Sequence, residues 1–126
     1  MAASQRFRVD NLAAGAVVVN VLAGTMFEFV AERPRAVRMW GVQDTIANAN
    51  IVVNVTYGTV TAVEDGFPLP TVPAAVPGDG PLRNEHELVS FMARPGARIK
   101  LACRNAGTAA HGAGLGARFL VEHQDF

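Results

Sequence analysis

The chain has 126 residues, of which half are apolar and 17% are charged, and its eleven basic and eleven acidic side chains cancel at neutral pH. This composition is typical of one globular domain and excludes the low hydrophobicity and high net charge of disordered chains. It also excludes a long-range field that would attract nucleic acid or an anionic membrane, so nucleic-acid contact is expected to be weak or absent.

A single cysteine, Cys103, excludes an internal disulfide, which is consistent with a reducing compartment or with assembly inside a cell. Alternation in the stretch IKLACRN places Cys103 on the same face as Ile99 and Leu101, which predicts a buried thiol rather than a reactive one. No apolar run reaches the roughly 18 residues that a membrane-spanning helix needs. We therefore expect a protein without a membrane span that is not exported.

Strand signals dominate the chain, and helix signals are almost absent because glycine, proline and β-branched residues interrupt every apolar helical period. Residues 1–14 are predicted to form an N-terminal arm, and residues 15–126 a single domain. About eight strands are predicted. In chain order they are residues 16–23, 26–31, 35–43, 50–57, 59–64, 86–93, 98–105 and 115–123.

Several of these strands alternate apolar and charged residues, as strands do when one face is buried and the other is wet. In the seventh, for example, Arg98, Lys100 and Arg104 alternate with the apolar set. Short antiparallel strands with Gly/Pro turns predict an all-β, two-sheet sandwich, and the eight-strand jelly roll matches the count best. An immunoglobulin-like sandwich is the rival, although the chain lacks the pair of cysteines that usually flanks a core tryptophan.

A proline-rich loop is predicted over residues 66–81, where the stretch GFPLPTVPAAVPGDGP holds five of the seven prolines. Proline removes backbone donors and favours extended geometry, so the loop should be stiff. Its apolar side chains either cover the sheet of their own domain or contact a neighbouring subunit. The candidates for contact between subunits are these side chains and two arginines of the arm: Phe67, Leu69, Val72, Val76, Arg6 and Arg8.

The three histidines are the first place to look for a metal site. His86, His111 and His123 do not have the short spacings of zinc motifs, and one cysteine cannot supply a thiolate pair. The paired histidine motifs of the cupins, which are jelly-roll proteins, are also absent. No catalytic residue, metal ligand or cofactor site is therefore predicted, and no enzymatic activity is expected.

Five stretches resemble the single jelly-roll structural proteins of non-enveloped icosahedral virions, including bacteriophage capsid and decoration subunits. They are NVLAGTMFEFV, NIVVNVTYGTVTAVED, the proline-rich loop, RPGARIKLACRNAG and ARFLVEH. The resemblance covers residues 15–124 and lies in strand order and loop character. The resemblance implies a subunit that assembles in the host cytoplasm with copies of itself or attaches to a shell. The chain departs from many capsid proteins in being short and in lacking a basic arm, which puts genome packaging in doubt.

Two other functions stay open at this point. A carbohydrate- or protein-binding module would use an exposed aromatic side chain such as Trp40 or Tyr57. A cupin-like metalloenzyme would need His86, Glu87 and His123 to converge in space.

Overall fold

The computed structural model describes residues 2–30, 33–72, 86–112 and 114–125. Within these ranges the chain forms nine β-strands and no helix, which confirms the all-β prediction. It therefore contains, in these ranges, no helix long and apolar enough to cross a membrane. The strands are β1 (Ala2–Asp10), β2 (Val17–Val18), β3 (Arg35–Asp44), β4 (Ile51–Tyr57), β5 (Val60–Pro68), β6 (Thr71–Val72), β7 (Glu87–Ala93), β8 (Ile99–Asn105) and β9 (Gly116–Asp125).

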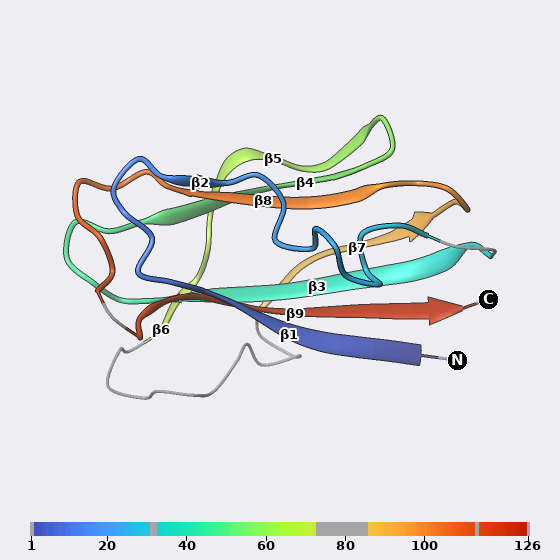
Figure 1. Cartoon of the computed structure of the whole chain (residues 1–126), viewed down its shortest axis with the longest axis horizontal. Helices are drawn as coiled ribbons and strands as arrows, with labels where there is room; N and C mark the ends of the chain where they lie inside the picture. Colours follow the sequence, from blue (N-terminus) through green and yellow to red (C-terminus); the bar gives the residue numbers. More distant parts are fainter. Residues whose placement is uncertain (1, 31–32, 73–85, 113, 126) are drawn as a thin grey trace.

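The strands form two sheets that face each other as a sandwich (Figure 1). One sheet has the order β1-β9-β3-β6, with β7 also paired to β3, and the other has the order β2-β8-β4-β5. Every pairing is antiparallel except the short one between β3 and β6. The predicted two-sheet sandwich is thus confirmed, with one short parallel pairing that was not expected.

Strand pairing is nested along the chain. β1 pairs with β9, β2 with β8, β3 with β7, and β4 with β5. The first half of the chain therefore runs antiparallel to the second half, and the tip lies at the hairpin between Tyr57 and Val60. Gly58 has a φ of 57° in this turn, a conformation that glycine adopts without steric cost. The two ends of the chain lie side by side as a consequence, with Ala2 opposite Gln124 (Figure 1).

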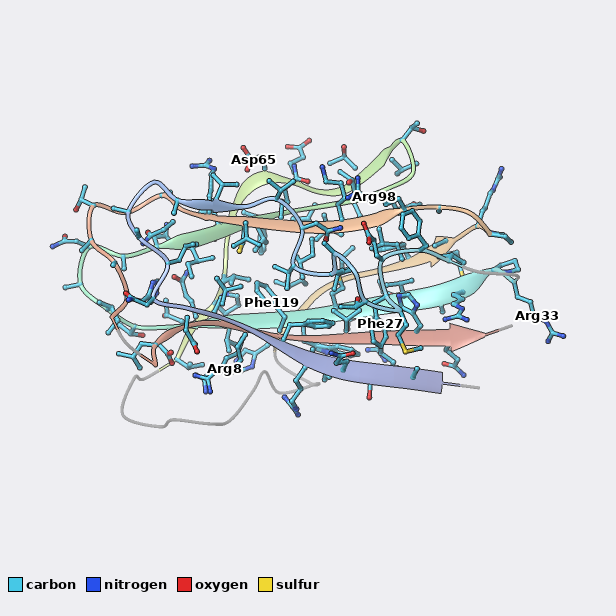
Figure 2. The ribbon with its side chains drawn as sticks, in the orientation of Figure 1. Arg8, Phe27, Arg33, Asp65, Arg98 and Phe119 are labelled. Atoms are coloured by element: carbon cyan, nitrogen blue, oxygen red, sulfur yellow. The ribbon has the colours of Figure 1, made fainter. Side chains whose placement is uncertain are left out.

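The core fills the space between the two sheets. Phe27 and Phe119 lie there, whereas Arg8, Arg33 and Asp65 point away from it (Figure 2). Full burial of one such aromatic side chain contributes about 1.5–3 kcal/mol. The alternation of β8 has the predicted outcome, because Ile99, Leu101 and Cys103 are all buried.

Six of the predicted strands are present as β3, β4, β5, β7, β8 and β9, with ends shifted by a few residues. The largest shift is in β5, which continues to Pro68 and so takes in the first residues of the predicted proline-rich loop. β6 occupies two more of its positions and pairs with the end of β3. Residues 73–81 of that loop lie outside the described residues.

The predicted N-terminal arm is corrected by β1. Ala2–Asp10 pairs with β9 along its whole length, so this segment belongs to the sheet. Phe7 and Val9 alternate with charged residues and pack against the core, and the ring of Phe7 lies edge-on to that of Phe27 with centroids 6.0 Å apart. Apolar and charged residues alternate in RFRVD, which is typical of a strand. The charges of Arg6 and Arg8 favoured the prediction of an arm instead.

The strand predicted over residues 16–23 is wrong beyond Val17–Val18. Asn20 is the physical reason. Its side chain accepts hydrogen bonds from the backbone N–H groups of Leu22 and Leu101 and donates one to the carbonyl of Ile99. The side chain thereby occupies backbone groups of β8 that would otherwise pair with the backbone of a neighbouring strand.

The strand predicted over residues 26–31 is also wrong, since the described part of it makes a single bridge, from Phe29 to Arg98. Local side-chain hydrogen bonds fold the preceding residues into turns. Glu28 accepts from the Gly24 N–H at 3.0 Å, and the Thr25 hydroxyl donates to the Leu22 carbonyl at 2.7 Å. The apolar residues in this stretch predicted a strand, but these polar groups decided its local structure.

Candidate interaction surface

The structure does not bring together the residues of the cupin-like alternative. Glu87 lies opposite Trp40 and forms an ion pair with Arg38 on the outer face of its sheet, at 3.0 Å. His123 lies on the inner face instead, where its ring packs edge-on to Phe27 with centroids 4.8 Å apart. Among the described residues, no group of three His, Cys, Asp or Glu side chains is placed to hold a metal ion.

The two aromatic side chains of the binding-module alternative have different environments. Trp40 is fully buried, and the Arg38 guanidinium lies 4.8 Å from its ring centroid. Tyr57 is partly exposed at the end of β4, and its ring stacks on that of Phe91 with centroids 4.2 Å apart. A ligand can therefore reach Tyr57 but not Trp40.

Cys103 is buried in the core, as predicted. Burial raises the pKa of its thiol to about 11, because the thiolate would lose its hydration there. The thiol is therefore protonated at neutral pH and is a poor nucleophile.

Leu69 is corrected as a candidate for contact between subunits. It is 2% exposed, and its Cδ2 atom lies 3.0 Å from the position that a Cβ on Gly41 would occupy. The side chain of Gln43 holds this segment by donating to the carbonyls of Leu69 and Ile51 at 2.9 and 3.1 Å. This part of the predicted loop packs on its own domain.

The other contact candidates differ in their exposure. Phe67 and Arg6 are exposed, and Val72 is half-buried within β6. Arg8 donates to the Asp10 carboxylate at 3.2 Å and to the carbonyl of Gly114 at 3.0 Å, so it makes contacts within its own chain. Val76 lies outside the described residues.

Four exposed apolar side chains follow one edge of the four-stranded sheet. Val17, Val19, Met26 and Phe29 are each between 54% and 64% exposed, and they are four of the seven exposed large apolar side chains among the described residues. We call the segment that carries them, residues 17–29, the β2 edge. Isolated exposed apolar residues are common on protein surfaces, but a row of them along a sheet edge is typical of an interaction surface.

Hydrogen bonds hold the β2 edge to β8 at intervals. The Val21 N–H donates to the Leu101 carbonyl at 2.8 Å, and the Ile99 N–H donates to the Glu28 carbonyl at 2.6 Å. On its other side β2 has no strand partner in the described part of the sheet, because it ends the strand order. The β2 edge is therefore an ordered surface that carries exposed apolar side chains, and one side of Val17–Val18 has no strand partner in the described sheet.

Glu28 keeps the middle of the β2 edge in place. The Gly24 N–H lowers the pKa of its carboxyl by hydrogen bonding, and the nearby Arg98 guanidinium, 2.9 Å away, lowers it further against the opposing effect of burial. The carboxylate therefore stays charged and keeps both partners at neutral pH.

The remaining exposed apolar side chains lie on strands at the other side of the sandwich: Val60 and Phe67 on β5, and Met92 on β7. Of the seven exposed apolar side chains among the described residues, only Phe67 was predicted from the sequence to make contacts between subunits. Alternation predicts which residues share a face of a strand, but it does not show which strand lies at the edge of a sheet. Comparisons with protein-family models, with curated proteins and with solved structures found no match to this chain.

Proposed function

We propose that this chain is a structural subunit that associates with copies of itself through the β2 edge, as a capsid or decoration protein of a virion does. The observation that carries the proposal is the row of exposed side chains Val17, Val19, Met26 and Phe29 on an ordered sheet edge. Charges are scarce on this row, so association there buries apolar area with little desolvation of charge.

The strand pairing supports a jelly-roll architecture for this subunit. A jelly roll contains eight strands in two sheets, arranged as two Greek keys. If β6 is set aside as a short extension, the pairs β1–β9, β2–β8, β3–β7 and β4–β5 leave eight strands in nested order. This architecture agrees with the resemblance to single jelly-roll virion proteins, and the step from fold to virion function is an analogy.

The size of the apolar row argues for many contacts rather than one. Burying the exposed half of one such side chain contributes roughly 1 kcal/mol. Four side chains on each of two copies then contribute about 8 kcal/mol, against an association cost of about 4–15 kcal/mol. A single edge contact is therefore weak, and it becomes stable when several contacts act together in a closed assembly.

Mutation of the β2 edge tests the proposal. We expect the purified protein to form large symmetric particles or oligomers, seen by negative-stain microscopy and by light scattering after gel filtration. The double variant Val19→Glu with Phe29→Glu should be monomeric with an unchanged melting temperature, because both side chains are exposed. Ser90→Glu, an exposed position on β7, is the matched control and should assemble normally.

Two outcomes count against this function. A monomeric wild-type protein at its highest soluble concentration contradicts self-assembly. Assembly that persists in the double variant but is lost in Phe67→Glu contradicts association through the β2 edge and indicates a contact through β5, at the residue predicted from the sequence.

A further inference from the structure

The β4–β5 turn and the C-terminal end of β7 lie at the same end of the sandwich (Figure 1). Residues of both segments line a cleft at this end. Its volume is about 770 Å³, which falls in the range of small-molecule sites. The lining residues come from the turn, from the end of β7 and from the two loops beside it: Pro34, Tyr57, Gly58, Thr59, Val60, Met92, Ala93, Arg94 and Ala97.

The walls of the cleft are mainly apolar and partly fixed in place. The ring of Tyr57 lies parallel to that of Phe91, at an interplanar angle of 4°, which limits its rotation. Val60 and Met92 line the cleft and are about half exposed, so an apolar ligand would cover surface that is now in water.

Backbone hydrogen bonds hold both sides of the cleft. The Gly58 N–H donates to the Arg98 carbonyl at 3.0 Å, which ties the hairpin tip to the residue that precedes β8. On the other side, the Ala97 N–H donates to the Arg94 carbonyl at 3.1 Å and the Gly96 N–H donates to the Val30 carbonyl at 2.7 Å. The cleft is therefore largely formed before any ligand arrives, which lowers the entropy cost of binding.

The polar side chains in the cleft can all donate hydrogen bonds. They are the hydroxyls of Tyr57 and Thr59 and the guanidinium of Arg94, and none of the three groups has a hydrogen-bond or ion-pair partner among the described residues. No acidic side chain occurs among the described lining residues. Arg33 also points away from the body at this end (Figure 2). This set of donors complements an anionic group.

We propose that the cleft binds a small apolar carboxylate, with its hydrocarbon part against Tyr57, Val60 and Met92 and its carboxylate on Arg94. Arginine suits this role because its planar donors match both carboxylate oxygens. The proposal does not depend on self-assembly, because the cleft shares no residue with the β2 edge.

A titration with octanoate and octan-1-ol tests the proposal, because these probes share a hydrocarbon chain and differ in charge. Amide chemical shifts of the ¹⁵N-labelled protein are followed at residues 58–60, 92–94, 96 and 97, since Pro95 has no amide proton. We expect saturable shifts there, with octanoate bound about 10-fold more tightly than octan-1-ol, as one charge-assisted hydrogen-bonded pair provides. Arg94→Gln should abolish the difference between the probes, and Arg94→Lys should keep part of it.

The matched control is Arg6→Gln, which removes the same charge from an exposed position on β1 and should bind both probes as the wild type does. Equal affinity of the wild type for the two probes, or shifts centred elsewhere, overturns the proposal. The titration is repeated on the variant Val19→Glu with Phe29→Glu. If this variant still binds octanoate, binding in the cleft does not depend on assembly. If it no longer binds octanoate, the cleft of a single chain is not the binding site.

Discussion

Asp44 and Arg118 form a buried ion pair. Their side chains are 4% and 6% exposed, and their closest atoms, Arg118 Nη2 and Asp44 Oδ1, lie 2.7 Å apart. Asp44 Oδ2 also accepts a hydrogen bond from the Gly116 N–H at 2.9 Å, at the start of β9. The pair therefore joins the end of β3 to the start of β9. Nothing in the sequence pattern predicted it, because the two residues are far apart in the chain.

Asp44→Asn should lower the free energy of unfolding by about 3 kcal/mol, because it leaves the Arg118 charge buried without a counter-charge. Chemical denaturation measures this change. Asp65→Asn is the matched control, since Asp65 lies 3.5 Å from Arg104 in an exposed pair, and its effect should stay within about 0.5 kcal/mol. Equal effects of the two substitutions would show that the buried pair contributes no more than a surface pair.

His111 should make stability depend on pH. Burial lowers the pKa of its imidazole, with Asp44 opposing the shift, and neither ring nitrogen makes a hydrogen bond to a described residue. Above the unfolded-state pKa of about 6.5, both states hold a neutral ring. As the pH falls below that value, His111 becomes protonated in the unfolded chain but stays neutral in the folded chain. The free energy of unfolding therefore declines until the pH passes below the folded-state pKa.

The expected result is a fall in the free energy of unfolding between about pH 7 and pH 5, a window chosen above the usual range of carboxyl pKa values. His111→Asn should flatten this fall relative to the wild type. A slope that is the same in both proteins would assign the pH dependence to other groups.

At the scale of elements, β1 is an integral strand rather than an arm. Deletion of residues 2–10 should lower the free energy of unfolding by at least about 2 kcal/mol, because Phe7 and Val9 lose their packing and β9 loses a partner strand. Hydrogen exchange should show faster exchange in β9 of the deletion variant. The charge variant Arg6→Gln keeps the strand and should be as stable as the wild type. If the deletion variant is also as stable as the wild type, residues 2–10 act as an arm and not as an integral strand.

At the scale of the whole molecule, charge and surface lead to a prediction about association. The chain carries no net charge at neutral pH, so copies do not repel one another strongly. If the β2 edge drives association, sodium sulfate should strengthen it, cooling should weaken it, and sodium chloride should have little effect. Light scattering measures all three. Dissociation in sodium chloride would instead indicate contacts through arginines such as Arg6.

The sequence by itself determined the all-β class, the two-sheet sandwich, six of the strands and the burial of Cys103. These follow from alternation and turn residues, which act between neighbours in the chain. The strands predicted within residues 16–31 were wrong, because apolar content predicts strands there. In the structure, side-chain hydrogen bonds of Asn20 and Glu28 stabilise turns instead.

Tertiary structure decided which strands end the sheets, and therefore which apolar side chains remain exposed. Val17 and Leu69 are both apolar residues beside strand signals, yet one lies on a free edge and the other fills the core beside Gly41. The pairing of Asp44 with Arg118 and the meeting of Tyr57 with Arg94 at one cleft arise in the same way. Such contacts depend on how strands that are distant in the sequence pack when the two sheets face each other. No local sequence pattern encodes that packing.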